Sequence, residues 1–254
     1  MFPIRDEIPS RRRPVVTWSL IALNVALFLY QLTLPESALA SLFYRFGLVP
    51  ARISDPAWAL AAGLPPGGYL GFLSGMFLHG GFLHLLFNMW TLWIFGDNVE
   101  DRMGRGRYLF FYLTCGVAAS VVQWLTNPAS TIPTIGASGA IAGVMGGYFL
   151  LFPHSRVLTL VPIFFYPLFL RIPAIVYLGL WFVLQLLSGT TSLGRGPDTG
   201  GVAFWAHVGG FAAGFLLVRP LSRREPEQLP GFARHFVMPH NPPFRPLRSG
   251  RLRD

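Results

Sequence analysis

The feature that most constrains this chain is a succession of apolar runs, each close to the length of a membrane span. A helix needs about 20 apolar residues to cross the ~30 Å hydrocarbon core of a bilayer. Five runs approach this length, and they predict helices over residues 15–34, 80–95, 108–125, 135–152 and 202–218. In agreement, 52% of the residues are hydrophobic and only 12% are charged. We therefore expect an all-α membrane protein.

The region between residues 156 and 188 is too long for a single span. Its first half contains Pro162, Pro167, Arg171 and Pro173, and proline interrupts helices. We therefore expect residues 157–170 to form a loop at the membrane interface. Residues 172–188 carry no charge and complete a predicted bundle of six transmembrane helices.

The arginines orient this bundle. The sequence has 20 basic residues, all of them arginine, and a formal charge of +9. Six spans place 17 of these arginines on the side of both termini and leave only Arg45, Arg52 and Arg195 on the other side. Because basic loops stay in the cytoplasm, both termini are predicted to be cytoplasmic, and spans two, four and six run inward. The charge is thus explained by topology, and we expect no nucleic-acid partner.

The chain is predicted to have three parts. Residues 1–14 form a cytoplasmic N-terminal segment, residues 15–219 the membrane domain, and residues 220–254 a basic, proline-rich and disordered cytoplasmic tail. A cleaved signal peptide is the alternative for the first apolar run, since Ala38-Leu39-Ala40 resembles a cleavage site. A signal peptide has an apolar core of only about 7 to 15 residues, so we expect this longer run to remain as the first span.

Four polar side chains inside the inward-running spans are candidates for a functional site: His84, Asn88, Ser138 and His207. A polar group within a span is costly and indicates function by default. Each of the four lies within about two or three helical turns of the outer end of its span, so they share a similar depth. We therefore expect them to line one cavity.

Ser138 belongs to a Gly136-Ala137-Ser138-Gly139 segment at the start of the fourth span. Free backbone N–H groups and the positive end of the helix dipole favour a developing anion there. This position suits a nucleophile with an oxyanion beside it. Small residues also serve close packing of membrane helices, and the segment alone does not separate the two interpretations.

His207 shares a face of the sixth span with Gly210 and Gly214, while Gly139 and Gly143 recur along the fourth span. Glycines let helices approach closely. If these two surfaces meet, His207 comes close to the candidate serine. A histidine that only hydrogen-bonds a backbone carbonyl is the alternative.

His84 and Asn88 are one helical turn apart and point in the same direction, so both could donate to a carbonyl oxygen that becomes negative. The alternative is an interhelical hydrogen bond of about 0.6 kcal/mol. His79 is expected to face elsewhere, at the interface. The acidic cluster at residues 97–101 lies among arginines, and we expect ion pairs there.

The predicted spans contain no aspartate or glutamate, so a Ser-His-Asp triad and an aspartyl mechanism are both excluded. A Ser-His dyad remains available. The chain also has no His-Glu-x-x-His motif, so metal-dependent hydrolysis fits the sequence less well.

Taken together, these motifs resemble those of the rhomboid family of intramembrane serine proteases, in order, spacing and host span. They are His79-x4-His84-x3-Asn88, Gly136-x-Ser138-Gly139 and Ala206-His207-x2-Gly210-x3-Gly214. The likeness covers about residues 15–219. Glu100-x-Arg102 also matches the pattern that follows the second span in this family.

The resemblance implies a bacterial-type, six-helix rhomboid bundle in the bacterial inner membrane. It makes Ser138 the nucleophile and His207 the general base, and it builds an oxyanion hole from His84, Asn88 and the Ser138 backbone N–H. The implied substrates are transmembrane segments of other proteins in the bilayer, and no metal or cofactor is used. Residues 34–77 would form a partly embedded first loop, and the loop before Val202 would gate substrate access.

In one place the chain departs from the pattern. Relatives often carry a Trp-Arg pair in the first loop where this chain has Leu70-Gly71.

Two other functions compete with proteolysis. A non-catalytic relative that guides membrane segments would be expected to lack Ser138 or His207, yet both are present. A transporter would show midplane charges or broken helices in paired halves, and neither pattern occurs in the sequence.

Overall fold

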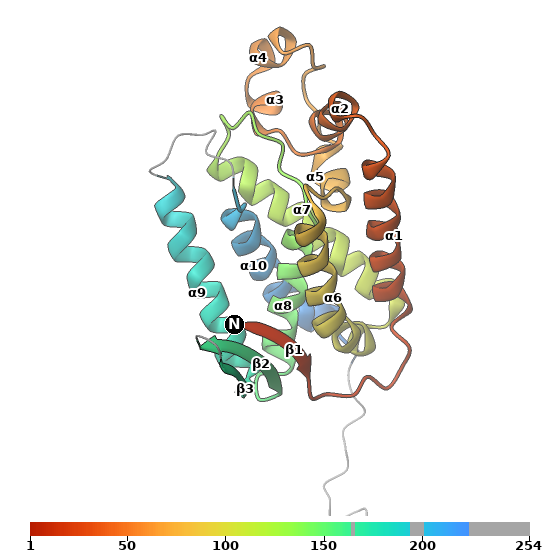
Figure 1. Cartoon of the computed structure of the whole chain (residues 1–254), viewed down its shortest axis with the longest axis vertical. Coiled ribbons are helices and arrows are strands. Elements are labelled where there is room, and N and C mark those ends of the chain that lie inside the picture. The colour runs from red at the N-terminus through yellow and green to blue at the C-terminus, as the bar shows by residue number, and fades with distance from the viewer. Residues whose placement is uncertain (164–165, 194–200, 224–254) are drawn as a thin grey trace, which may run out of the picture. The chain divides into compact units, whose positions relative to one another are not determined.

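Every predicted span forms a helix in the computed structural model, which describes residues 1–163, 166–193 and 201–223 (Figure 1). The six helices are α1 (Val15–Leu32), α6 (Phe82–Met103), α7 (Arg105–Thr126), α8 (Ser138–Leu151), α9 (Ala174–Leu193) and α10 (Phe204–Leu221). By length and apolar character, α1, α7, α9 and α10 could each cross a membrane alone. A fifth span results if α6 is counted with the short helices that precede it, across a bend of 95°. The predicted tail lies outside the described residues from position 224 onward.

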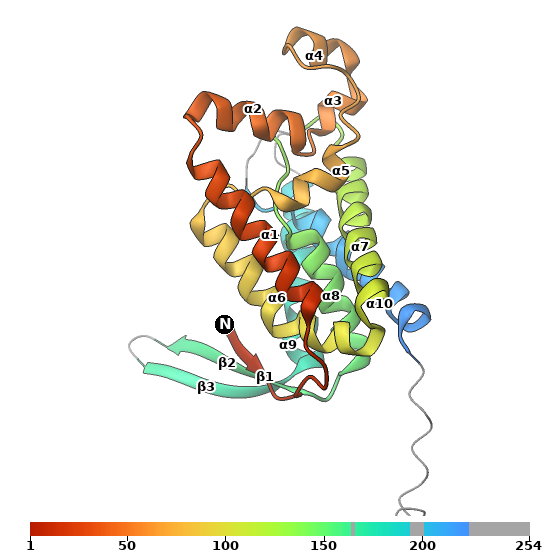
Figure 2. The ribbon, with the colours of Figure 1, turned by 90° about the vertical axis from the view of Figure 1, so that its right-hand side faces the viewer.

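The first loop is itself helical. It contains α2 (Glu36–Phe46), α3 (Pro50–Ser54), α4 (Pro56–Ala61), α5 (Gly71–Ser74) and the 3-10 turn η1 (Gly75–Phe77). Figure 2 shows α2 lying across the axes of the long helices. The buried guanidinium of Arg52 holds the loop together, since it donates hydrogen bonds to the carbonyl oxygens of Tyr44, Arg45 and Pro65 at 2.7–3.1 Å.

Helix α8 lies at the centre of the bundle, where ten of its 14 residues are buried. It packs against α6, α7, α9 and α10. The approach of α10 is especially close, because a Cβ atom added to Gly210 would overlap the carbonyl oxygen of Gly139. In the same way, a Cβ on Gly214 would overlap the carbonyl oxygen of Gly143. The two glycine surfaces therefore meet backbone to backbone.

The expectation that residues 157–170 lack regular structure was wrong, because this region forms a β-hairpin; its predicted position at the membrane interface stays a prediction. β2 (Arg156–Ile163) pairs antiparallel with β3 (Tyr166–Pro173), and β1 (Phe2–Asp6) joins the other edge of β2. The two prolines that argued against regular structure, Pro162 and Pro167, lie opposite each other near the hairpin end. Pairing elsewhere along the strands satisfies the backbone groups of this segment.

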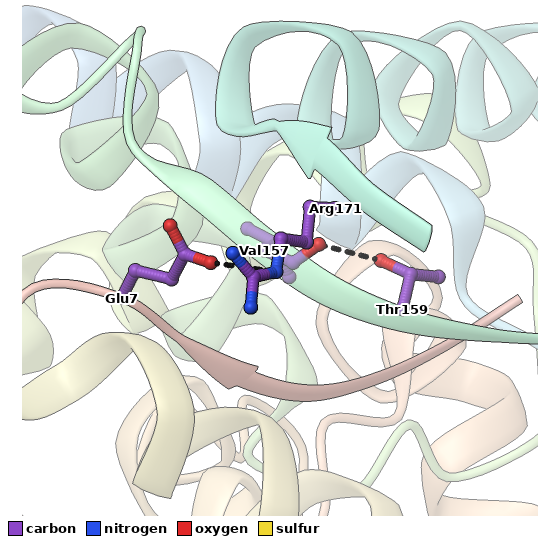
Figure 3. A network of polar contacts seen from close by, with 4 residues as sticks. All are labelled: Glu7, Val157, Thr159 and Arg171. Atoms are coloured by element: carbon purple, nitrogen blue, oxygen red, sulfur yellow. Dashed lines mark hydrogen bonds and ion pairs between the residues drawn. The ribbon is translucent and has the colours of Figure 1, made fainter. Parts of the chain in front are cut away.

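Side chains reinforce this three-stranded sheet (Figure 3). Arg171 of β3 reaches the segment after β1, where its Nε lies 3.3 Å from Glu7 Oε1. On β2, the Thr159 hydroxyl donates to the carbonyl oxygen of Val157 at 3.2 Å. The carboxylate of Asp6 accepts hydrogen bonds from Asn98 of α6 and Tyr148 of α8, which fastens β1 to the helices.

Glu100 has a different role from the ion pair expected at its turn. Its buried carboxylate accepts hydrogen bonds from the backbone N–H groups of Val16 and Thr17 and from the Thr17 hydroxyl, at 2.8–3.0 Å. These are the donors that the start of α1 leaves unpaired, and Pro14 at the N-cap offers no side-chain acceptor. A carboxylate is also favoured by the positive end of the helix dipole. Glu100 thus caps α1 from a distant part of the sequence.

Candidate active site

The four polar residues selected from the sequence all line one cavity of about 790 Å³. His84 and Asn88 reach it from α6, Ser138 from the start of α8, and His207 from α10. Residues 129–130 and 132–135, before α8, and residues 201–205, at and just before the start of α10, complete much of the wall. The shared depth inferred from the sequence thus corresponds to a shared space.

Ser138 is the first residue of α8 and is half-buried. Within the described part of the chain, the backbone N–H groups of Ser138, Gly139 and Ala140 have no hydrogen-bond acceptor. The first hydrogen bond of the helix forms at the next residue, where the Ile141 N–H donates to the Ala137 carbonyl oxygen. The start of α8 therefore directs free donors towards any anion formed at the serine.

Gly136 brings the serine turn close to α6. Its φ is +121°, a value that disfavours any side chain, and an added Cβ would lie 2.5 Å from His84 Nε2. Asn88 Nδ2 is the next group along the same face, 3.6 Å from that position. A glycine here therefore allows His84 and Asn88 to approach the backbone two residues before Ser138.

His84 and Asn88 both present donors. His84 Nδ1 accepts a hydrogen bond from the Gly80 backbone N–H at 3.5 Å, which leaves the proton of a neutral ring on Nε2. Asn88 is only 7% exposed, and among the described residues its Nδ2 has no hydrogen-bond partner. A buried amide without a partner costs about 1–3 kcal/mol. Such a group facing a cavity indicates that a ligand oxygen supplies the partner.

His79 was expected to lie at the interface and to face away from His84, and the predicted direction was wrong. The residue is buried, and its ring packs edge-on against that of His84 with centroids 5.2 Å apart. Its backbone is held by the Gln31 side chain of α1, which donates to the His79 carbonyl oxygen and accepts from the His79 N–H. The sharp bend before α6 explains the error, because helical spacing does not extend through it.

His207 is 9% exposed, and its Nδ1 lies 2.9 Å from Gln185 Oε1 of α9. The Trp181 ring covers the imidazole at a centroid distance of 5.7 Å. Among the described residues no direct hydrogen bond joins Ser138 to His207. The two side chains share the cavity, and catalytic hydrogen bonds often form only when substrate binds.

Two glutamines near the cavity were missed by sequence reasoning. Gln185 contacts the imidazole, and Gln123 of α7 accepts a hydrogen bond from the Ala206 N–H at 3.3 Å, beside His207. Both are amide side chains inside apolar runs. The rule that selected Asn88, a polar group inside a span, would have found them as well.

Comparison with known proteins gives the same family as the motifs. The model of the Rhomboid domain family matches residues 66–224, which include all the candidate residues. The chain is 30% identical over 148 residues to Rhomboid protein 1, mitochondrial, of Saccharomyces cerevisiae, covering 57% of this chain and 39% of the yeast protein. It is 30% identical over 138 residues to the putative rhomboid protease YdcA of Bacillus subtilis, covering 54% and 62%.

A plant relative is RHOMBOID-like protein 5 of Arabidopsis thaliana, which is 35% identical over 153 residues, covering 58% of this chain and 44% of the relative. The chain thus spans less than two thirds of the length of each of these relatives. The family match nevertheless includes more than half of the chain and five of its six long helices. With its apolar helices and this match, the chain is a multi-pass membrane protein that belongs to the rhomboid family.

Proposed function

We propose that this chain is an intramembrane serine endopeptidase that cleaves transmembrane segments of other membrane proteins. The observation that carries the proposal is the cavity at the start of α8, which joins a serine and a histidine to a set of unpaired donors. Two bacterial relatives, YdcA and GluP of Bacillus subtilis, carry names that call them rhomboid proteases. These names support hydrolysis as the chemistry of the site.

In the proposed mechanism, His207 is the general base. The hydrogen bond to Gln185 Oε1 places the proton of the neutral imidazole on Nδ1, so the Nε2 lone pair is free. Nε2 removes the Ser138 proton as Oγ attacks the scissile carbonyl carbon, and it then returns a proton to the leaving amine. Water hydrolyses the resulting acyl-enzyme, with His207 again as the base.

The carbonyl oxygen becomes negative during this attack, and the unpaired donors are placed to stabilise it. We assign this role to His84 Nε2–H, Asn88 Nδ2–H and the backbone N–H of Ser138. They belong to two different helices that the fold holds together through Gly136. Donors that are already oriented need no reorganisation when the charge develops, which is the main advantage of an oxyanion hole.

The orientation and location belong to the same proposal. We propose that both termini are cytoplasmic and that the host membrane is a bacterial inner membrane, on the basis of the arginine distribution and the resemblance to bacterial-type members. The proposed membrane domain, residues 15–219, ends close to Ser222, where the compact unit Met1–Ser222 ends. The loop assigned to substrate access includes residues 194–200, which lie outside the described residues.

A serine-reactive fluorophosphonate tests the nucleophile and its base directly. We expect it to label the purified protein in liposomes at Ser138, identified by peptide mass. His207→Ala should slow labelling by about 10²- to 10⁴-fold, the usual contribution of a general base. His154→Ala is the matched control, because His154 is exposed in the turn after α8 and does not line the cavity. Undiminished labelling of a folded His207→Ala variant would remove His207 from the mechanism.

A further inference from the structure

Helix α9 contacts His207 although most of its surface is exposed in the bundle. Only three of its 20 residues, Ala174, Leu178 and Gly189, are buried. Gln185 and Trp181 meet the imidazole of His207 on α10, and Phe182 stacks on Phe211 one turn further along α10. One turn beyond Gln185, the Gly189 carbonyl oxygen accepts a hydrogen bond from the indole of Trp205 at 3.1 Å.

We propose that Gln185 is a positioning residue for His207, so that the dyad is active only while α9 packs against α10. This inference rests on the proposed protease function. In serine proteases with a triad, a carboxylate on Nδ1 selects the tautomer and orients the imidazole. Gln185 Oε1 occupies that place here, and it is the only hydrogen-bond partner of the His207 ring among the described residues.

The amide of Gln185 is itself oriented. Its Nε2 donates to the carbonyl oxygen of Trp181, one turn earlier in α9, at 3.3 Å. With the NH₂ group engaged there, the oxygen faces the imidazole and accepts the proton of Nδ1. A neutral amide performs this selection without placing an ionised carboxylate inside a span, where a charge is costly.

The arrangement also makes the dyad sensitive to the position of α9. If α9 moves away from α10, His207 loses both the hydrogen bond on Nδ1 and the contact with the Trp181 ring. The imidazole then samples both tautomers, and only one of them has a free Nε2. Displacement of α9 thus lowers the activity of Ser138 without any change in α8 or α10.

The experiment compares Gln185→Leu and Gln185→Glu with wild type in liposomes, using a single-span test substrate. For Gln185→Leu we expect kcat to fall roughly 10- to 100-fold with KM nearly unchanged, as befits loss of one hydrogen bond to the base. Gln185→Glu keeps an acceptor and adds a charge, so it should recover much of kcat and shift the acidic limb of the pH–rate profile upward. Thr190→Val is the control on α9, since that hydroxyl bonds only within its own helix.

A second readout does not depend on turnover. Ring ¹⁵N chemical shifts of His207 should report the Nδ1–H tautomer in wild type and a mixture in Gln185→Leu. Gly189→Leu should produce the same mixture with Gln185 intact, because a Cβ there already lies 3.2 Å from Trp205. Gly179→Leu, where the nearest atom is an ordinary 3.6 Å away, is its control.

The outcomes separate the two proposals. Wild-type kcat, pH profile and tautomer in Gln185→Leu would overturn the positioning role and leave the protease intact. Wild type that neither cleaves nor reacts with the fluorophosphonate would overturn the proposed function. A shifted tautomer in Gln185→Leu but not in Gly189→Leu would overturn the dependence on α9.

The β2–β3 hairpin carries a second inference, which is independent of catalysis. Figure 2 shows it extending from the ends of the long helices, across their axes. Tyr166 is 82% exposed and Phe169 is 56% exposed, and Leu168 and Leu170 are also exposed. Because successive residues of a strand face opposite sides, both faces of the hairpin are apolar here.

We infer that this outer part of the hairpin lies in the headgroup boundary of the bilayer. It is continuous with α8 and α9, which belong to the membrane bundle, and aromatic side chains are enriched at that boundary. Its backbone groups pair between strands, as an apolar environment demands. Arg156, exposed at the base of the hairpin, adds a cation suited to anionic lipid headgroups.

An environment-sensitive fluorophore tests this placement. In a Cys115→Ala background, we expect the NBD group on Tyr166→Cys to emit at shorter wavelength in liposomes and to be quenched by brominated lipid. The same label on His154→Cys, exposed in the turn before β2, should show neither effect. Equal, water-like emission at both sites would overturn the inference. So would a blue shift without lipid quenching, which would indicate that protein covers the hairpin.

Discussion

Ser138→Ala should abolish cleavage of a single-span test substrate by the purified protein in liposomes. Without Oγ no acyl-enzyme forms, and loss of the nucleophile alone lowers kcat by about 10⁶ in a serine protease. The fold should remain intact, because the Ser138 hydroxyl has no hydrogen-bond partner among the described residues, so its removal breaks no contact of this kind. Product formation measured by gel against substrate concentration checks the rate, and thermal melting checks the fold.

Ser19→Ala is the matched control. Ser19 is exposed on α1, and its hydroxyl donates to the Val15 carbonyl oxygen of its own helix. Cleavage that persists in Ser138→Ala would show that another group is the nucleophile. A wild-type protein that captures the substrate but never cleaves it would instead favour the non-catalytic alternative, a rhomboid-like protein that guides membrane segments.

The helices were predictable because the bilayer sets their length. The run predicted over 108–125 became Arg105–Thr126, and the run over 202–218 became Phe204–Leu221. The prediction that the polar residues share one depth rested on the same constraint, since spans that run in one direction begin at one interface. Depth was enough to group four residues around one cavity.

The sequence did not predict how each helix is rotated about its own axis, or which distant residues its side chains contact. Glu100 binds the start of α1, 83 and 84 positions earlier in the sequence, whereas the nearby arginines suggested a local ion pair. Gln185 reaches a histidine 22 positions later, and the apolar run of α9 does not specify which of its faces turns towards α10. The hairpin was obscured because Pro162 and Pro167 were read as breakers of structure, while in the sheet they face each other.

Asn88→Ala should lower kcat by about 10²- to 10³-fold, with KM and thermal stability close to wild type. An oxyanion donor acts on charge that exists only in the transition state, so its loss reduces turnover rather than substrate binding. A role in helix packing predicts the opposite pattern, a lower melting temperature with normal turnover. The structure already weighs against packing, because Asn88 Nδ2 has no partner within the described part and its removal breaks no hydrogen bond.

Asn24→Ala separates these roles with the same chemical change. Asn24 is fully buried in α1 and does not line the cavity; its Nδ2 donates to the Leu20 carbonyl oxygen of the same helix, and its Oδ1 has no partner among the described residues. Its loss should leave kcat unchanged, so that any change in its melting temperature reports a packing role alone. His84→Ala should behave like Asn88→Ala, because His84 Nε2 is the second side-chain donor. If Asn88→Ala instead melts early while its folded fraction turns over normally, Asn88 is a packing residue. The oxyanion would then depend on His84 and on the free N–H groups at the start of α8.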